Sequence, residues 1–599
     1  MRRRHELPFG AEITSDGVRF RLWAPKAERV ALRLHGTGDL PMMKEAGGWH
    51  QLTTGAAHAG SRYQYLIGDQ AVPDPASRYQ PEDVHGPSEV VDPGAYEWRD
   101  AMWPGRRWEE IVLYELHAGT FSESGDFAGI ARHLDHLVDL GITAIELMPV
   151  ADFPGGRNWG YDGVLLFAPD GRYGRPEDLK RLVDQCHARG LAVFLDVVYN
   201  HFGPDGNYLH LYAPDFFTER HKTPWGAAIN FDGANARPVR DFFIENALYW
   251  LEEFHIDGLR FDAVHAILDD SRRPILTELA ETVRARLGAA RPIHLVLEND
   301  KNQTRFLAPH LFTAQWDDDI HHCLRVLTSG EVEGYYADYA ERPVEHLGRA
   351  LAEGFAYQGE PSAYRGEARG EPSAGQPPTV FVAFIQNHDQ VGNNAFGMRL
   401  AKLAAPDLIR LAAAIYLLSP QIPMLFMGEE WGAEQPFAFF CDFGPELAKA
   451  VREGRRREFA KFPEFRDERA RERIPDPCAA QTFASSVLDW RAAARPPHAA
   501  WLAWYRELLA LRAREIAPRL RGIEGHAGTY RVLGPRALQV EWRLGDGAIL
   551  TLLANFADDA VASGDAPQGR LLYAVGAAPT TDMLAPRAAV FFLSEPRRG

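Results

Sequence analysis

Eight short apolar runs, separated by stretches of helical periodicity, constrain the fold of this chain more than any other feature. The runs lie at residues 111–117, 142–149, 191–198, 258–262, 293–298, 314–316, 380–386 and 422–428. Alternation of strands and helices predicts a parallel sheet, and eight such units predict a (β/α)₈ TIM barrel enlarged by insertions. The alternative, an open doubly wound sheet, usually carries a glycine-rich phosphate turn after its first strand. No such turn follows the first run here.

The regions on either side of the predicted barrel show a different pattern. Residues 18–25 and 29–34 alternate apolar and polar side chains, which predicts a small β-sandwich. Alternating runs return after a predicted helix at residues 501–515. We therefore expect a multidomain chain with an N-terminal β-sandwich (1–97), a catalytic barrel (98–500), and a linker helix followed by a C-terminal antiparallel β domain (501–599).

Three segments interrupt this regular pattern. Residues 201–237 follow the third run and are irregular and rich in aromatic residues, so we expect an inserted segment. Residues 358–378 approach low complexity, which predicts a mobile loop. Residues 452–474 carry dense charges of both signs, which is typical of a solvated helical surface.

Charge and cysteine content exclude several classes of protein. The net charge is −17 and no basic stripe is present, so a nucleic-acid partner is not expected. No window approaches the roughly 18 apolar residues that a membrane-spanning helix needs. The four cysteines are scattered without CxxC spacing, which indicates reduced thiols in a cytoplasmic protein.

Carboxylates at or near the ends of apolar runs point to chemistry. Asp196, Asp262, Glu298 and Asp389 occupy such positions on four different runs. In a barrel, side chains at the carboxyl ends of the strands face one shared pocket. A single aspartate after a strand is more often a helix cap or an ion-pair partner. Four of them are better explained by a reaction such as cleavage of a bond between two sugars.

The surroundings of two of these acids predict different protonation states. Arg260 lies two residues before Asp262, so both side chains are on the same face of the strand and the arginine favours an ionised aspartate. Glu298 follows an apolar run, and burial favours its protonated form. Such a pair supplies the nucleophile and the general acid of a retaining glycosidase. His201 and His388 are candidates for hydrogen bonds to sugar hydroxyls.

Clusters of aspartate and histidine also bind metal ions, so this alternative needs consideration. The chain has no HxH or HExxH motif, and such spacings are typical of metal sites. We therefore predict no metal and no cofactor. Glu429 and Glu430, after the eighth run, either act in the site or brace the barrel.

Four segments resemble, in order, the conserved segments of the α-amylase superfamily of glycoside hydrolases. They are DVVYNH (196–201), GLRFDAVH (258–265), LVLEND (295–300) and QNHD (386–389). The resemblance implies that Asp262 is the nucleophile, Glu298 the acid/base, and Asp389 the carboxylate that stabilises the transition state. It implies substrate contacts at Arg260, His201, His388 and Tyr161. Asn200 matches a calcium ligand of some relatives, but the rest of that site is not evident.

A narrower resemblance covers most of the chain. PFGAEI (8–13), YELHAGTFS (114–122), AQWDDDIHH (314–322), GYYADY (334–339), FMGEEWG (426–432) and VREGRRREF (451–459) resemble the maltooligosyltrehalose trehalohydrolase family. That family hydrolyses the α-1,4 bond next to a terminal trehalose. The resemblance implies a maltooligosyltrehalose or related α-glucan substrate, and a functional pairing with a maltooligosyltrehalose synthase.

The same resemblance implies further substrate-binding residues, although Ile320 stands where the family usually has an aromatic residue. These residues are Phe261, Ala263, Val264, His265, Asp318, Asp319, Ile320, His321, His322, Gln390, Val391, Gly392 and Asn393. Three alternatives remain. A glycogen branching or debranching enzyme would share the three acids. A synthase that isomerises the chain end would need to exclude water. A non-catalytic carbohydrate-binding protein would be expected to lack at least one of the acids.

Overall fold

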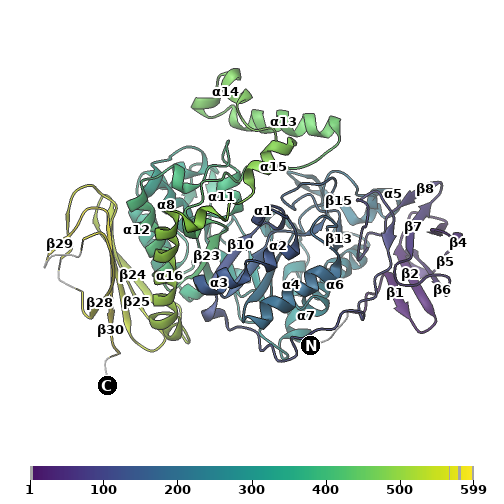
Figure 1. The fold of residues 1–599 in the computed structure, drawn as a ribbon, viewed down its shortest axis with the longest axis horizontal. Coiled ribbons are helices and arrows are strands. Elements are labelled where there is room, and N and C mark those ends of the chain that lie inside the picture. The colour runs from purple at the N-terminus through teal and green to yellow at the C-terminus, as the bar shows by residue number, and fades with distance from the viewer. Residues whose placement is uncertain (1–4, 565–566, 578–581, 597–599) are drawn as a thin grey trace.

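The computed structural model describes residues 5–564, 567–577 and 582–596 and contains three parts. Figure 1 shows a central barrel, with an N-terminal β-sandwich (purple) at one end and a C-terminal sheet (yellow) at the other. The predicted multidomain fold class is confirmed. The first four residues of the predicted 1–97 unit, and short stretches of the 501–599 unit, lie outside the described residues.

The barrel is a closed sheet of eight parallel strands in sequence order, from β10 round to β23. Every strand lies within one of the apolar runs identified in the sequence. The ring closes between the first and last strands, where Leu113 is in register with Met424. The strands are β10 (Leu113–Leu116), β11 (Ala144–Leu147), β14 (Ala192–Val197), β17 (Gly258–Phe261), β18 (His294–Leu297), β19 (Ala314–Trp316), β22 (Phe381–Ala383) and β23 (Ile422–Phe426).

Helices follow the barrel strands, as the alternating pattern predicts. On α4 (Pro176–Ala188), for example, Leu179, Leu182 and Val183 are buried. The longer helices are α3 (Leu134–Leu140), α4 (Pro176–Ala188), α6 (Ala236–Glu253), α7 (Ile275–Leu287), α8 (Asp318–Ser329), α10 (Pro343–Glu353), α12 (Pro406–Leu418) and α16 (His498–Glu515).

The N-terminal part consists of two antiparallel sheets, with strand orders β1-β2-β6-β5 and β4-β3-β7-β8. Phe20, Leu32 and Tyr65 are fully buried in it. The strands are β1 (Gly10–Thr14), β2 (Gly17–Trp23), β3 (Val30–Leu34), β4 (Gly38–Pro41), β5 (Met43–Lys44), β6 (Trp49–Thr54), β7 (Arg62–Ile67), β8 (Gln70–Val72) and β9 (Ser88–Glu89), which pairs with β7.

The C-terminal part is an antiparallel sheet of order β24-β25-β26-β30-β28, with a separate β27-β29 pair. The side chains of Leu538, Trp542 and Leu552 are fully buried. The strands are β24 (Gly528–Gly534), β25 (Ala537–Arg543), β26 (Ile549–Asn555), β27 (Val561–Ala562), β28 (Arg570–Val575), β29 (Met583–Leu584) and β30 (Ala588–Ser594).

The inserted and charged segments contain short elements of their own. The segment 201–237 holds α5 (Leu209–Tyr212) and the hairpin of β15 (Phe217–Thr223) and β16 (Gly226–Ile229). The charged segment forms α13 (Pro445–Phe459) and α14 (Glu468–Glu472), with most side chains exposed or half-buried, as predicted. Nowhere in the described residues is there a helix both long and apolar enough to span a membrane.

The segment 358–378, whose composition predicts a mobile loop, contains secondary structure. It forms a small hairpin of β20 (Pro361–Ser362) and β21 (Glu367–Ala368). Arg369, next to this hairpin, is buried and forms an ion pair of 2.8 Å with Asp319 on α8. Arg369 also donates a hydrogen bond to the Tyr339 hydroxyl. Arg369 therefore pairs with partners that are remote in sequence.

The buried ion pair makes this segment important for stability. We expect Arg369→Met to lower the free energy of unfolding by about 3–5 kcal/mol, because it leaves the Asp319 carboxylate buried without its cation. The matched control is Arg342→Met, since Arg342 is 64% exposed in its pair with Glu345 and should change stability by less than about 1 kcal/mol. Chemical denaturation measures both. Equal effects of the two substitutions would contradict the prediction.

Glu429 and Glu430 brace the barrel, which was one of the two roles considered for them. Glu429 accepts hydrogen bonds from the hydroxyls of Tyr416 and Tyr505. Glu430 accepts one from Tyr114 on the first barrel strand. Both glutamates are buried, so they link the end of β23 to its neighbours.

Candidate active site

Arg260 brings the predicted acids together. Its side chain, on β17, is 2% exposed and donates hydrogen bonds to Asp196 (2.6 Å) and Asp262 (2.8 Å). Its other terminal nitrogen lies 3.5 Å from Glu298 Oε2, and its guanidinium packs 4.3 Å from the centre of the Trp316 ring. Carboxylates from three successive strands of the barrel sheet, β14, β17 and β18, therefore surround one cation.

Glu298 has the environment expected of a proton donor. Burial raises its pKa well above the usual value, and the negative charges of Asp262 and Asp318 act in the same direction. Arg260 and the backbone N–H of Ala263, which donates to Glu298 Oε2, oppose this shift without cancelling it. Glu298 is therefore expected to hold its proton well above the pH at which an ordinary glutamate loses it.

The turn after Asp262 is held in an unusual backbone conformation. Ala263 has φ of 40°, in the left-handed region that non-glycine residues rarely adopt. The turn is fixed from the next strand, because the Val264 N–H donates to the Glu298 carbonyl over 3.0 Å. Strain of this kind is common at functional sites. The Val264 hydrogen bond ties the backbone after Asp262 to that of Glu298.

Asp389 lies on α11 (His388–Gly392), beyond the seventh barrel strand. Burial raises its pKa, against the positive charges of His388 and Arg260. The backbone N–H of His388 donates to Glu115, and its ring Nδ1 contacts the same carboxylate at 2.5 Å. Although burial lowers the pKa of His388, the charge of Glu115 raises it overall.

Glu115 is a site residue that the sequence reasoning missed. It lies in β10, and its side chain is 1% exposed. Like Asp196, it is an acid within an apolar run, so the same rule applied to the first run would have identified it. Its carboxylate holds both the backbone N–H and the ring of His388.

Tyr161 and His201 form another wall of the site. The Tyr161 hydroxyl donates to Asp196 Oδ2 over 2.6 Å, and its ring stacks on His388 with centres 5.0 Å apart. His201 Nε2 donates to the Tyr161 carbonyl over 2.9 Å. The Trp225 ring, at the tip of the β15–β16 hairpin, stacks on His201 at 4.4 Å and is 49% exposed. An exposed ring beside such residues offers an apolar face to a sugar.

Asp318 and Gln390 form a polar wall near Asp389. Gln390 Nε2 donates to Asp318 Oδ1 over 3.4 Å, and its Oε1 accepts from the Tyr335 hydroxyl over 3.0 Å. Burial, together with the charges of Asp300 and Asp389, raises the pKa of Asp318 to about 7. This wall offers both donors and acceptors to hydroxyl groups.

Several expected substrate-binding side chains are enclosed by the protein. Phe261, Val264, Asp319, Ile320, His321, His322 and Val391 are all buried, as are Arg260 and His388. Asp319, for example, is occupied by Arg369 and Tyr339. A Cβ on Gly392 would lie 2.0 Å from the Trp159 ring, so this glycine permits close packing. His265 is half-buried and Asn393 is exposed.

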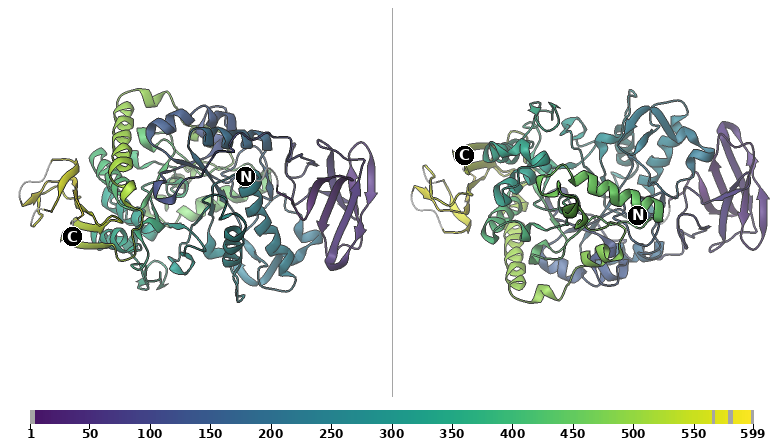
Figure 2. Two further views of the ribbon diagram at one scale, coloured as in Figure 1. Left: turned by 90° about the horizontal axis from the view of Figure 1, so that it is seen from below. Right: turned by 90° about the horizontal axis from the view of Figure 1, so that it is seen from above.

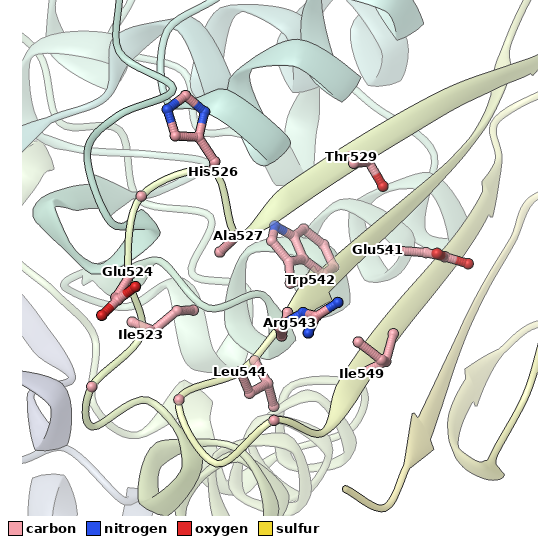
Figure 3. A pocket seen from close by; sticks show the side chains of 14 residues that line it. Ile523, Glu524, His526, Ala527, Thr529, Glu541, Trp542, Arg543, Leu544 and Ile549 are labelled. Atoms are coloured by element: carbon pink, nitrogen blue, oxygen red, sulfur yellow. The ribbon is translucent and has the colours of Figure 1, made fainter. Parts of the chain in front are cut away.

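Two pockets differ in whether residues of the predicted site line them. One of about 410 Å³ is lined by Val264, His265, Lys301 and Gln303, which follow β17 and β18. Another, of about 470 Å³, is formed by residues 522–549 at the C-terminal sheet. Figure 3 shows this second pocket around His526 and Trp542. None of the predicted site residues lines it.

Within the described part of the chain, His221, Asp232 and Asp270 form a group whose ligand atoms lie close enough to share a cation. Arg220 already pairs with Asp232 at 3.4 Å and with Asp270 at 3.2 Å. The single guanidinium of Arg220 therefore offsets part of the negative charge of these two carboxylates.

Comparison with known proteins gives three matching family models. Residues 8–91 match carbohydrate-binding module 48, the isoamylase N-terminal domain. Residues 111–246 match the catalytic domain of alpha amylase. Residues 525–591 match a domain of unknown function, DUF3459.

Similar proteins cover nearly the whole chain. The malto-oligosyltrehalose trehalohydrolase of Saccharolobus solfataricus is 43% identical over 492 residues, covering 81% of this chain and 84% of the relative. The chain belongs to the malto-oligosyltrehalose trehalohydrolase family. The family member of Deinococcus radiodurans is also 43% identical, over 90% of this chain and 88% of its own. A crystal structure from Salmonella typhimurium, assigned provisionally as an alpha amylase, is 47% identical with a TM-score of 0.94, covering 98% of this chain and all of that one.

Proposed function

We propose that this chain is a retaining glycoside hydrolase that cleaves the α-1,4 bond next to the terminal trehalose of maltooligosyltrehalose. The products are trehalose and a maltooligosaccharide. The observation that carries this proposal is the pairing of Asp262 and Glu298 around Arg260, in a chain of this family. The alternative of a non-catalytic carbohydrate-binding protein is not favoured, because Asp262, Glu298 and Asp389 are all present.

The reaction proceeds in two displacements. Glu298 donates its proton to the glycosidic oxygen while an Asp262 oxygen attacks the anomeric carbon. The carbon–oxygen bond to trehalose breaks, trehalose leaves, and a covalent glycosyl-enzyme remains. The Glu298 carboxylate then takes a proton from water, whose oxygen attacks the same carbon and releases Asp262. Two inversions leave the product in the α configuration.

Positive charge develops on the sugar ring in both transition states. Asp389 is proposed to stabilise it and to hold ring hydroxyls, while Arg260 keeps Asp262 in place. Tyr161 offers its ring beside the same sugar. These roles explain why the charged groups converge on one point of the barrel.

Selectivity for trehalose is proposed to come from polar contacts. An α,α-1,1-linked glucose pair places its hydroxyls differently from maltose, so a wall built for one leaves buried polar groups unpaired with the other. Asp318, Gln390 and Tyr335 form such a wall. A maltooligosyltrehalose synthase is the enzyme that would supply this substrate.

Product analysis tests the proposed function. The enzyme is incubated separately with maltooligosyltrehalose, maltopentaose and glycogen, and the sugars are separated by chromatography. We expect rapid release of trehalose from the first and much slower cleavage of the second. Altered branching of glycogen, without trehalose release, would instead support the branching or debranching alternative.

The pH dependence of kcat/KM follows from the raised pKa of Glu298. The proton is present below that pKa and is lost as pH rises through it, so kcat/KM on maltooligosyltrehalose should fall on the alkaline side. α-Maltosyl fluoride is the control substrate, because fluoride leaves without a proton from the enzyme. Its reaction should lack this alkaline fall when formation of the glycosyl-enzyme is followed. The same fall with both substrates would contradict the assignment.

A further inference from the structure

Arg455 differs from its arginine neighbours on α13. The side chain of Arg457 is 73% exposed, whereas that of Arg455 is 9% exposed. Its guanidinium packs against the rings of Phe459 (4.7 Å) and Phe439 (5.6 Å). It also pairs with Glu458 at 3.1 Å. A buried, stacked arginine on a highly charged helix indicates a specific partner.

That partner is the stretch of chain that follows Asp389. Arg455 Nη2 donates to the carbonyl of Gly392 over 2.7 Å and to that of Asn394 over 3.3 Å. Nη1 donates to the side-chain oxygen of Asn393 over 3.2 Å. One guanidinium therefore holds three consecutive residues at the end of α11.

Asn393 passes this contact on to Asp389. Its side-chain Nδ2 donates a hydrogen bond to Asp389 Oδ1. An arginine side chain has only hydrogen-bond donors, so Arg455 cannot accept a hydrogen bond from the Asn393 amide nitrogen. It therefore favours the orientation in which the Asn393 side-chain oxygen faces the guanidinium. The amide nitrogen then faces Asp389. Because Asn393 is otherwise exposed, little else fixes this orientation.

We propose that Arg455 is a positioning residue for Asp389, acting through the orientation of the Asn393 amide. The inference rests on the proposed role of Asp389 in the reaction. It gives a function to α13, which lies outside the strand–helix repeat together with α14. Figure 1 shows them projecting from the barrel on the side of α11, and Figure 2 gives two further views of this arrangement.

Without Arg455, we expect Asp389 to be misplaced enough to lower the reaction rate measurably. An error of about 1 Å in a group that acts on the transition state can reduce the rate by up to about 10²-fold. We therefore expect Arg455→Ala to lower kcat on maltooligosyltrehalose by about 10- to 100-fold, with a smaller change in KM. Arg455→Lys keeps the charge but not the forked contacts, and should recover only part of the rate.

A double-mutant cycle separates this role from a general loss of structure. Asn393→Ala should also lower kcat, and adding Arg455→Ala to it should cause little further loss, because the two residues act in one chain of contacts. Arg457→Ala on the same helix is the control and should retain the wild-type rate. Thermal melting of each variant reports whether the fold is kept.

The outcomes distinguish this inference from the proposed function. Suppose that the wild-type enzyme releases trehalose. If Arg455→Ala then has the wild-type kcat, or if the kcat losses of Arg455→Ala and Asn393→Ala multiply independently in the double variant, the inference is wrong and the proposed function stands. If the wild-type enzyme releases no trehalose, the proposed function itself fails. The inference is supported if the folded Arg455→Ala and Asn393→Ala variants each lose kcat and the double variant loses little more than either one.

Discussion

Replacing Asp262 by alanine should lower kcat on maltooligosyltrehalose by at least about 10³-fold, because no covalent intermediate can form without the nucleophile. The substitution should spare the fold. Arg260 keeps its 2.6 Å pair with Asp196 and its contact with Glu298, so it is not left without a counter-charge. Steady-state kinetics with chromatographic detection of trehalose measures the loss.

Two controls sharpen this test. The thermal melting temperature of Asp262→Ala should remain close to that of the wild type. The variant should also fail on α-maltosyl fluoride, since a better leaving group does not replace a nucleophile. Near-wild-type turnover of either substrate by a folded variant would refute the assignment of Asp262.

Glu298→Gln should lower kcat on maltooligosyltrehalose by about 10²–10⁴-fold, the usual contribution of general acid–base catalysis. Glutamine has nearly the same shape as the protonated glutamic acid and can still accept the Ala263 N–H bond. It cannot protonate the departing trehalose or take a proton from water. Kinetics on the natural substrate measures the combined loss of these two roles.

The two acids should differ on an activated substrate. Glu298→Gln should still form the glycosyl-enzyme from α-maltosyl fluoride, because fluoride departs without a proton. Asp262→Ala should not. If both variants lost this first step equally, Glu298 would not be the general acid.

The barrel could be predicted from the sequence because its strands are short, apolar and buried on both faces. Such runs remain visible without any knowledge of contacts, and all eight became strands of the closed sheet. Asp262 and Glu298 were identified for the same reason: each acid directly follows a strand. The strand period of two also placed Arg260 beside Asp262, and the 2.8 Å contact confirms this.

These sequence patterns could not predict contacts between segments that are remote in sequence. The composition of residues 358–378 suggested a mobile loop, whereas Arg369 is buried through its pair with Asp319 on another element. Trp225 stands in an irregular insertion, and only the folded hairpin brings its ring onto His201. Arg455 looked like one charge among many.

Resemblance predicts which segments contact the substrate but not the direction of each side chain. On α8, Asp318 contacts Gln390, whereas the next two residues, Asp319 and Ile320, are enclosed. Neighbours on a helix point about 100° apart, so a continuous stretch cannot present every side chain to one cavity. The structure separates the two groups.

The central claim is that Asp262 and Glu298 act on the same anomeric carbon, one as nucleophile and one as acid/base. Its most direct test is to react Glu298→Gln with α-maltosyl fluoride, digest the protein and analyse the peptides by mass spectrometry. Without the base that activates water, the glycosyl-enzyme should accumulate, with a maltosyl group attached to Asp262. A maltosyl group on any other residue, or hydrolysis of the fluoride with no adduct and with inverted configuration, would contradict the account.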